Sequence, residues 1–295
     1  MSFATKSTFS SLHCRPLNAI ALGVALAASM RSMVVSAQIS SDVIEEVVVW
    51  GRSLQLLGSA DSSSQGVVGY ADFSTRPLAR VGELVEVVPG MIATQHSGPG
   101  KANQYFLRGF NLDHGSDFST FFDGMPVNFR THAHAQGYMD LNFIIPEIIE
   151  RVDFKKGPYF ANTGDFSLAG TSSMKTYDTL ERGFVEVTVG SADEIRVVVA
   201  NSFSTEQGSL LYALEHQQTN GMFGLDQDVR KYNGLLKYTG EIGGIPSQLT
   251  LTAYDSEWIS TNQVPQRAVA SGQIDRFGFI DPDLGGQSHR YSLSG

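Results

Sequence analysis

Hydrophobic and polar residues alternate with a period of two through most of the chain after Gly183. This spacing places apolar side chains on one face of a strand, and each patterned stretch is roughly 8–11 residues long. Short, turn-like connections alternate with longer polar ones, as in up-and-down antiparallel strands, although an exported β-sandwich also fits. The stretches are GFVEVTVGS, EIRVVVANSF, GSLLYALEHQQTNG, DVRKYNGLLKYTGE and SQLTLTAYDSEW.

Residues 75–180 are rich in glycine and mix two periodicities. Pro77 suits the first position of a helix after Ser74 or Thr75, and Pro89-Gly90 ends it. Between them, one helical face is formed by Leu78, Val81, Leu84, Val85 and Val88. Short strands are predicted in QYFLRGF, FSTFFDGMPV and IIERVDFKKGP, each closed by Gly or Pro. The region therefore predicts a compact α+β domain.

The first 37 residues have the pattern of a cleavable signal peptide. Lys6 and Arg15 give a positive start, Ala19 to Met30 is an apolar run, and Val35-Ser36-Ala37 suits signal peptidase. A transmembrane anchor is the alternative, but the run is shorter than the ~20 residues that a helix needs to cross a bilayer.

Residues 38–74 begin with an isolated β-prone segment, IEEVVVWGR (Ile44 to Arg52). It is followed by the Ser/Gly-rich tract LGSADSSSQGVVGYADFS, whose composition predicts a flexible linker. A lone strand on a flexible tether is suited to pairing with the edge of another protein's sheet.

Charge and cysteine content narrow the function further. The net charge is −9, and removal of residues 1–37, which carry three basic residues and no acidic ones, makes it −12. An acidic protein is a poor partner for nucleic acid. The single cysteine, Cys14, leaves with the signal, so the mature chain has no disulfide, thiol nucleophile or cysteine metal ligand.

Histidines are concentrated in three predicted loops of the α+β domain. His132 and His134 are two residues apart, so on an extended segment they share one side and could reach one metal ion. Nitrogen ligands favour zinc, copper or nickel over magnesium or calcium. Hydrogen bonding to loop backbone or contact with an organic ligand is the alternative. The predicted substrate-binding residues are His96, His114, Arg130, His132 and His134, with Asp113, Asp117 and Asp140 as possible oxygen ligands.

Some of the same residues form parts of catalytic motifs, but the residues next to them are not those that the complete motifs need. The His-x-His pair continues as Ala135-Gln136, where metallohydrolases need Asp-His. GPGKA lacks the first glycine of a phosphate loop and has Ala102 where Ser or Thr would hold magnesium. The sequence also contains no Gly-x-Ser-x-Gly elbow. A non-catalytic role is therefore predicted, with no required cofactor.

Four ordered landmarks resemble the plug domain of TonB-dependent outer-membrane receptors: ELVEVVPGM, FLRGF, FFDGMPV and IIPEIIERVDFKKGPY. With the signal before them and alternating strands after them, the resemblance covers roughly residues 43–295. Thr-Gly and Ala-Gly in GPYFANTGDFSLAGTSSMKT depart from the family's usual Tyr-Gly and Gly-Gly.

The resemblance implies an α+β plug domain followed by antiparallel β strands of an incomplete transmembrane β-barrel. Its parts would be a signal peptide (1–37), TonB box and linker (38–74), plug (75–180) and first barrel strands (181–295). Such receptors have 22-stranded barrels that need over ~300 residues, and about 115 follow residue 180. The chain is therefore expected to be the N-terminal part of a receptor or a truncated product.

The same resemblance assigns roles to residues. The segment that would pair with the periplasmic TonB-type coupling protein is Ile44, Glu45, Glu46, Val47, Val48, Val49 and Trp50. The family's landmark positions are Arg108, Gly109, Asp123, Gly124, Glu150, Arg151, Gly157 and Pro158. Internal ion pairs are expected for the charged ones and tight turns for the glycines.

The implied function is import of a scarce substrate across the outer membrane, with a metal chelate or metal ion favoured by the histidines. An exported soluble β-rich binding or adhesion protein is the alternative.

Overall fold

The structure is a computed structural model that describes residues 62–76, 78, 80–95 and 99–295. The predicted signal peptide, the segment Ile44–Trp50, Pro77 and His96 lie outside the described residues. Within the described part of the chain, no helix has both the length and the apolar character needed to cross a membrane.

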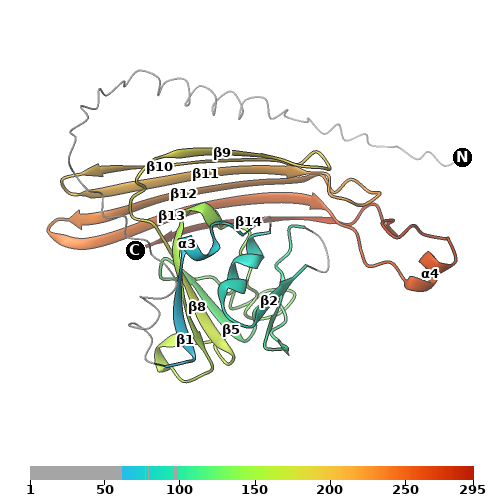
Figure 1. Cartoon of the computed structure of the whole chain (residues 1–295), viewed down its shortest axis with the longest axis horizontal. Coiled ribbons are helices and arrows are strands. Elements are labelled where there is room, and N and C mark those ends of the chain that lie inside the picture. The colour runs from blue at the N-terminus through green and yellow to red at the C-terminus, as the bar shows by residue number, and fades with distance from the viewer. Residues whose placement is uncertain (1–61, 77, 79, 96–98) are drawn as a thin grey trace, which may run out of the picture. The chain divides into compact units, whose positions relative to one another are not determined.

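The N-terminal domain, residues 62–180, is built on a five-stranded mixed sheet (Figure 1). Four neighbouring pairs in this sheet include one parallel pair, β5 with β8, and the others are antiparallel. The strand order is β1 (Gln65–Gly69), β7 (Ile149–Lys156), β8 (Gly170–Thr176), β5 (Phe118–Phe122) and β6 (Met125–Pro126). The three strands predicted for this region lie where the Gly and Pro signals placed them.

The predicted linker is too long at its C-terminal end. Residues 65–69 form β1, which pairs antiparallel with β7 from Gln65↔Lys155 to Gly69↔Arg151. The next four residues form α3 (Tyr70–Phe73), and Phe73 is fully buried. Phe73 belongs to the hydrophobic core and Val68 packs against it, so the Ser/Gly-rich composition did not keep this tract out of the fold.

A second, three-stranded sheet contains β2 (Met91–Thr94), β3 (Gln104–Leu107) and β4 (Phe110–Asn111). The predicted helix before it is a 3-10 helix, η2 (Val81–Val87), rather than an α-helix beginning at Pro77. Its predicted apolar face is nevertheless the buried one, since Val81, Leu84, Val85 and Val88 all lie in the core. Two further 3-10 turns are η3 (Pro146–Ile148) and η4 (Ala161–Thr163).

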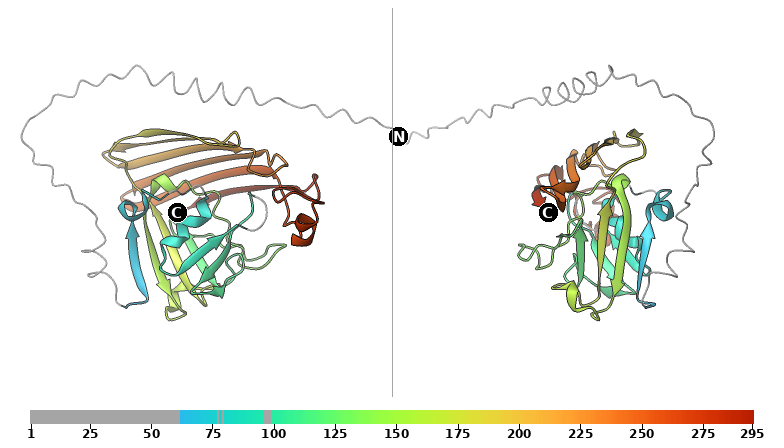
Figure 2. Two further views of the ribbon diagram at one scale, coloured as in Figure 1. Left: turned by 45° about the vertical axis from the view of Figure 1, so that its right-hand side comes forward. Right: turned by 90° about the vertical axis from the view of Figure 1, so that its left-hand side faces the viewer.

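The rest of the chain forms a six-stranded antiparallel sheet, the long-stranded sheet. Both views in Figure 2 show its strands side by side in sequence order. They are β9 (Phe184–Val189), β10 (Ile195–Thr205), β11 (Gly208–Thr219), β12 (Val229–Ile242), β13 (Ile245–Ile259) and β14 (Gly285–Ser294). The sheet is open, with β9 and β14 at its edges, and β12 and β13, at 14 and 15 residues, exceed the predicted length.

The two faces of the long-stranded sheet differ in chemistry. Along β12, Lys231, Asn233 and Lys237 are buried, whereas Tyr232 and Leu236 are exposed. Strand pairing continues the exposed apolar face across the sheet, through Val185, Val187, Val189, Leu214, Leu249, Leu251, Tyr291 and Leu293. The buried face of the sheet therefore combines polar and charged residues with apolar ones, and its exposed face is mainly apolar.

The buried face of the long-stranded sheet is joined to the N-terminal domain by charged contacts. Arg196 of β10 pairs with Glu147 at 2.6 Å and with Glu215 of β11 at 2.5 Å. Lys237 of β12 donates to the Thr176 carbonyl and hydroxyl oxygens, each at 3.1 Å. The described residues of both parts also share one hydrophobic cluster, to which Val198, Leu211 and Leu235 belong.

Candidate functional site

A cavity of ≈ 480 Å³ lies between loops of the N-terminal domain and the long-stranded sheet. The sheet contributes Trp258 from the end of β13 and residues 287–289 from the start of β14. The N-terminal domain contributes Gly100, Lys101, His114, Phe129, His132, His134, Tyr138 and Asp140. Three of the predicted histidines thus line one space, with His289 as a fourth.

The cavity is at the end of the sheet with the long connections. Residues 260–284 join β13 to β14 and include the short helix α4 (Gln266–Ala270), and residues 220–228 join β11 to β12. At the opposite end, two-residue turns join β10 to β11 and β12 to β13. The predicted alternation of short and long connections is therefore present, and the cavity opens among the long ones.

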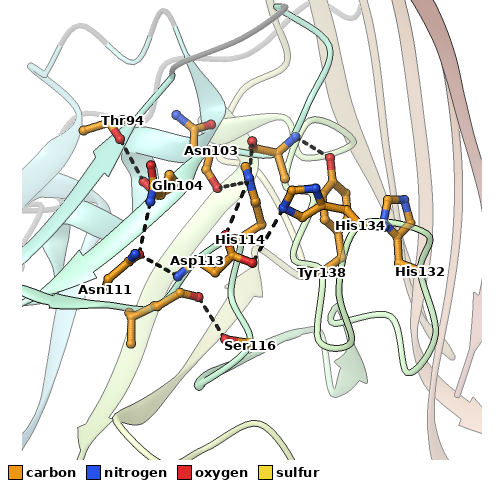
Figure 3. A network of polar contacts seen from close by, with 12 residues as sticks. Thr94, Asn103, Gln104, Asn111, Asp113, His114, Ser116, His132, His134 and Tyr138 are labelled. Atoms are coloured by element: carbon orange, nitrogen blue, oxygen red, sulfur yellow. Dashed lines mark hydrogen bonds and ion pairs between the residues drawn. The ribbon is translucent and has the colours of Figure 1, made fainter.

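His114 is held in one orientation by the backbone. Its Nδ1 lies 3.0 Å from the carbonyl oxygens of both Ala102 and Asn103 (Figure 3). Carbonyls only accept hydrogen bonds, so Nδ1 carries the proton and Nε2 keeps its lone pair. Burial, and next the neighbouring His134, lower the pKa of His114, which favours the neutral ring.

Asp113 and His134 lie next to the Nε2 side of the His114 ring. The Asp113 carboxylate lies 3.9 Å from Nε2 of His114 and 3.6 Å from Nε2 of His134. The rings of His114 and His134 are 4.4 Å apart, edge to face. Asp113 has a φ of 51°, a left-handed conformation that is uncommon outside Gly and Asn. One candidate ligand atom from each of these three residues falls within 4.8 Å of the others.

His132 lies outside that group of three, and the predicted His132–His134 metal pair stays a prediction. The His132 ring stacks on Tyr138 with centroids 3.9 Å apart and planes 11° apart. Its Nδ1 accepts a hydrogen bond from the backbone N–H of His134 at 3.1 Å. The loop is bent here, and the His132 and His134 rings both line the cavity.

The cavity wall also holds buried oxygen groups. Asp140 accepts a hydrogen bond from the Asn142 N–H at 2.9 Å, and burial raises the pKa of its carboxyl. The Tyr138 hydroxyl accepts a hydrogen bond from the Ala102 N–H, and burial raises its pKa to about 12. Tyr138 therefore stays protonated at neutral pH and presents a ring face and a hydroxyl to the cavity.

Asn128 joins the loops that carry the histidines. Its side-chain amide donates to the carbonyl oxygens of Gly115, Phe118 and Gly137 at 2.9–3.1 Å. Its side-chain oxygen accepts from the Thr120 N–H at 2.8 Å. One buried residue thus sets the distance between the loop of His114 and the loop of His134.

The other predicted binding residues lie apart from this group. Arg130 is exposed and does not line the cavity. Asp117 accepts a hydrogen bond from Ser116 at 2.8 Å, outside the three-residue cluster. Tyr138, Trp258 and His289 were missed by sequence reasoning, because only the pairing of β13 with β14 brings the last two to the histidine loops.

The landmark residues serve turns and internal contacts. Asp123 accepts from the Thr176 N–H and hydroxyl at 3.0 and 2.6 Å and lies 3.6 Å from Lys237. Arg151 pairs on the surface with its neighbour Glu150 at 3.2 Å and with Asp153 at 3.4 Å. Positive φ angles mark turns at Arg108 (52°), Gly109 (82°), Gly124 (85°) and Gly157 (86°), and Pro158 follows the last of these.

Residues 59–171 match the family described as TonB-dependent receptor plug domain. Three solved structures are similar to the chain. The copper transporter OprC has 18% identity and a TM-score of 0.50 over 68% of this chain and 31% of its own. The siderophore receptor PirA from Acinetobacter baumannii has 18% identity and a TM-score of 0.51 over 68% and 32%.

The third is a variant of the ferric enterobactin receptor PfeA from Pseudomonas aeruginosa in complex with enterobactin. Its identity is 17% and its TM-score 0.53, over 79% of this chain and 38% of its own. The chain thus spans about a third of the length of the solved proteins it matches. At these identities the likeness establishes the fold. Residues 59–171 are thus a TonB-dependent receptor plug domain, and the plug domain together with the antiparallel strands that follow it has the fold of the similar solved structures.

Proposed function

We propose that this chain is the N-terminal part of an outer-membrane TonB-dependent receptor that binds a scarce substrate and imports it. The substrate would be a metal chelate or a metal ion, bound first in the cavity lined by the histidines. The work is conformational and involves no covalent step, so the bound substrate must favour the state that the coupling protein recognises.

The cavity is the observation that carries this proposal. The plug domain and the long-stranded sheet build it jointly, at the end of the sheet where the connections are long. Outer-membrane barrels have their longer loops on the extracellular side. A ligand in this cavity would contact loops on both sides, so its binding can change how the plug domain is held.

The outward face of the long-stranded sheet supports a membrane location. Leu236, Leu249 and Leu251 are 42–47% exposed on one face, and Val185, Val187 and Val189 reach 61–75%. A contiguous apolar face of this kind is characteristic of strands that contact lipid. It also counts against the soluble binding or adhesion protein, whose outer surface would be mostly polar.

The lining of the cavity supports a metal-bearing substrate. Histidine nitrogens and the Asp140 carboxylate are potential metal ligands, and Phe129, Tyr138 and Trp258 offer flat apolar surfaces for an organic chelator. Among the similar structures, OprC is named a copper transporter, and PirA and PfeA are named siderophore receptors.

Coupling would use the segment Ile44–Trp50. An unpaired β-prone segment can add to the edge of another protein's sheet, with main-chain hydrogen bonds providing most of the affinity. Proline removes a main-chain donor, whereas alanine keeps it. Val47→Pro and Val47→Ala are therefore a matched pair that changes the backbone in one case and only the side chain in the other.

The test is uptake of radiolabelled zinc, copper and iron–siderophore by cells whose only copy of the full-length gene carries one of these substitutions. We expect one substrate to depend on the gene, with Val47→Pro reducing its uptake to the level of the deletion strain and Val47→Ala retaining most of it. Fractionation should find the wild-type protein and both variants in the outer membrane. Equal uptake in the two variants would contradict the coupling role, and a soluble periplasmic protein would contradict the receptor function.

A further inference from the structure

Three candidate ligand residues, Asp113, His114 and His134, come together beside the cavity. The Asp113 Oδ1 lies 3.9 Å from Nε2 of His114 and its Oδ2 lies 3.6 Å from Nε2 of His134, and one ligand atom from each of the three residues falls within 4.8 Å of the others. Two ligands on one tetrahedral zinc ion, each about 2.0–2.1 Å from the metal, are about 3.4 Å apart. Side-chain movements that shorten the separations by at most about 1.4 Å would bring the atoms to that spacing.

The His114 ring is already arranged as metal-binding histidines usually are. A metal-ligating histidine donates its second ring N–H to a carbonyl or carboxylate, which fixes the tautomer and the ring plane. Here the Ala102 and Asn103 carbonyls accept from Nδ1, and Figure 3 shows the opposite edge of the ring directed at Asp113 and His134. The ring cannot turn without losing both hydrogen bonds.

The three residues differ in burial, and the difference suits a site that takes up an ion and releases it again. The His114 side chain is almost completely buried, whereas those of Asp113 and His134 are 44% and 49% exposed. Structural zinc sites are closed by four protein ligands, and sites with three keep a position for water or another ligand. Three protein ligands, two of them accessible, permit both capture and release of an ion.

The donor set selects the class of ion. Two imidazoles and one carboxylate suit zinc, copper(II) and nickel, whereas magnesium and calcium prefer oxygen ligands alone. Cys14 is the only cysteine of the chain and lies before the plug domain, so no thiolate is available for a softer ion such as copper(I).

From this arrangement we infer that Asp113, His114 and His134 form a mononuclear site for a divalent zinc-class ion, captured as the ion itself. The inference rests on the proposed receptor function and names the substrate class of the same cavity. The His132 ring, stacked on Tyr138, lies outside the ligand set.

The site can be tested by calorimetric titration of the full-length protein, purified in detergent and stripped with a chelator, using the chlorides of zinc, nickel, copper(II) and magnesium. We expect one ion per chain for the first three and no heat of binding from magnesium. His134→Ala should weaken zinc binding by at least about tenfold, since even loss of an outer-shell partner costs that much. Asp113→Asn should also weaken it, and asparagine tolerates the left-handed backbone at this position.

His216→Ala is the matched control, because His216 stacks on Tyr232 and neither lines the cavity nor belongs to the ligand group. It should change the affinity by no more than about twofold, as substitutions away from the site do. Equal weakening by His216→Ala and His134→Ala, or zinc affinity unchanged in both His134→Ala and Asp113→Asn, would overturn the site.

Binding in detergent needs no coupling protein, so this result is independent of whether Val47→Pro blocks uptake. Zinc uptake in cells should fall in His134→Ala and persist in His216→Ala. Unchanged zinc uptake in His134→Ala, despite weakened binding, would overturn the assignment of the ion as substrate while leaving the receptor function in place.

Discussion

The plug domain and the long-stranded sheet differ in what they bury and what they expose. In the plug domain the buried face is apolar, as in any soluble domain, with Leu84, Phe118 and Ile144 at 0% exposure. In the sheet, Lys237 is 2% exposed while its neighbour Leu236 is 42% exposed. The inner face of the sheet therefore mixes buried charges with apolar residues such as Leu235, whereas its outer face is mainly apolar.

This difference indicates that the surfaces of the two regions are suited to different environments. The plug domain faces water or the wall of the sheet, so apolar groups go inward. The sheet is expected to face lipid on one side, so its polar groups turn toward the plug domain and pair there. Glu147, Arg196, Glu215 and Lys231 form one such buried charge cluster across the two regions.

Breaking that cluster should have the largest effect on stability. The Glu215 residue is 3% exposed and holds both Arg196 and Lys231, at 2.5 and 3.3 Å. Glu215→Ala leaves two buried cations without this partner, which costs about 3–5 kcal/mol. The measurement is the urea midpoint for unfolding of the full-length protein in lipid vesicles.

Glu257→Ala is the control, because Glu257 pairs with Arg230 on the exposed side at 3.3 Å. Exposed pairs contribute only ~0–1 kcal/mol. If both substitutions moved the midpoint equally, the inner face of the sheet would not be a low-dielectric environment and the comparison between the regions would fail.

A charge on the outward face should have the next largest effect. Leu236 lies near the middle of β12, and Leu236→Arg would place a guanidinium in the centre of a bilayer, at a cost of about 2–4 kcal/mol. The same substitution at Ile242, the last residue of β12, should cost only ~0–1 kcal/mol because it would lie near the interface. Unfolding of both variants in lipid vesicles measures the two losses of stability. An equal loss in both would favour the soluble binding or adhesion protein.

Strands β9 to β13 could be predicted from local patterns because each of them carries its own alternation. Val185, Val187 and Val189 mark one face of β9 without reference to any other segment. Pairing at a distance could not be predicted in this way. The tract at 65–69 is Ser/Gly-rich in its surroundings, and only β7, some eighty residues later, makes it a strand.

The site shows the same limit. Spacing of two residues predicts that His132 and His134 share a side, provided that the segment is extended. The loop instead turns so that the His134 N–H reaches His132, and His134 meets Asp113 and His114 from another loop. The residue types were predictable from the sequence, whereas their grouping depends on a tertiary contact through Asn128.

Loss of the Asn128 contact should have a smaller effect on stability than Glu215→Ala or Leu236→Arg. Asn128 is neutral, so its loss leaves no buried charge, but Asn128→Ala would strip the carbonyls of Gly115, Phe118 and Gly137 of a donor. Buried groups left unpaired cost about 1–3 kcal/mol. Asn220→Ala, which removes an exposed hydrogen bond to Asp193, should stay within about 0.5 kcal/mol. Urea unfolding measures the loss of stability in both variants. If Asn128→Ala destabilised the protein as little as Asn220→Ala, the buried Asn128 amide would not be what holds the histidine loops together.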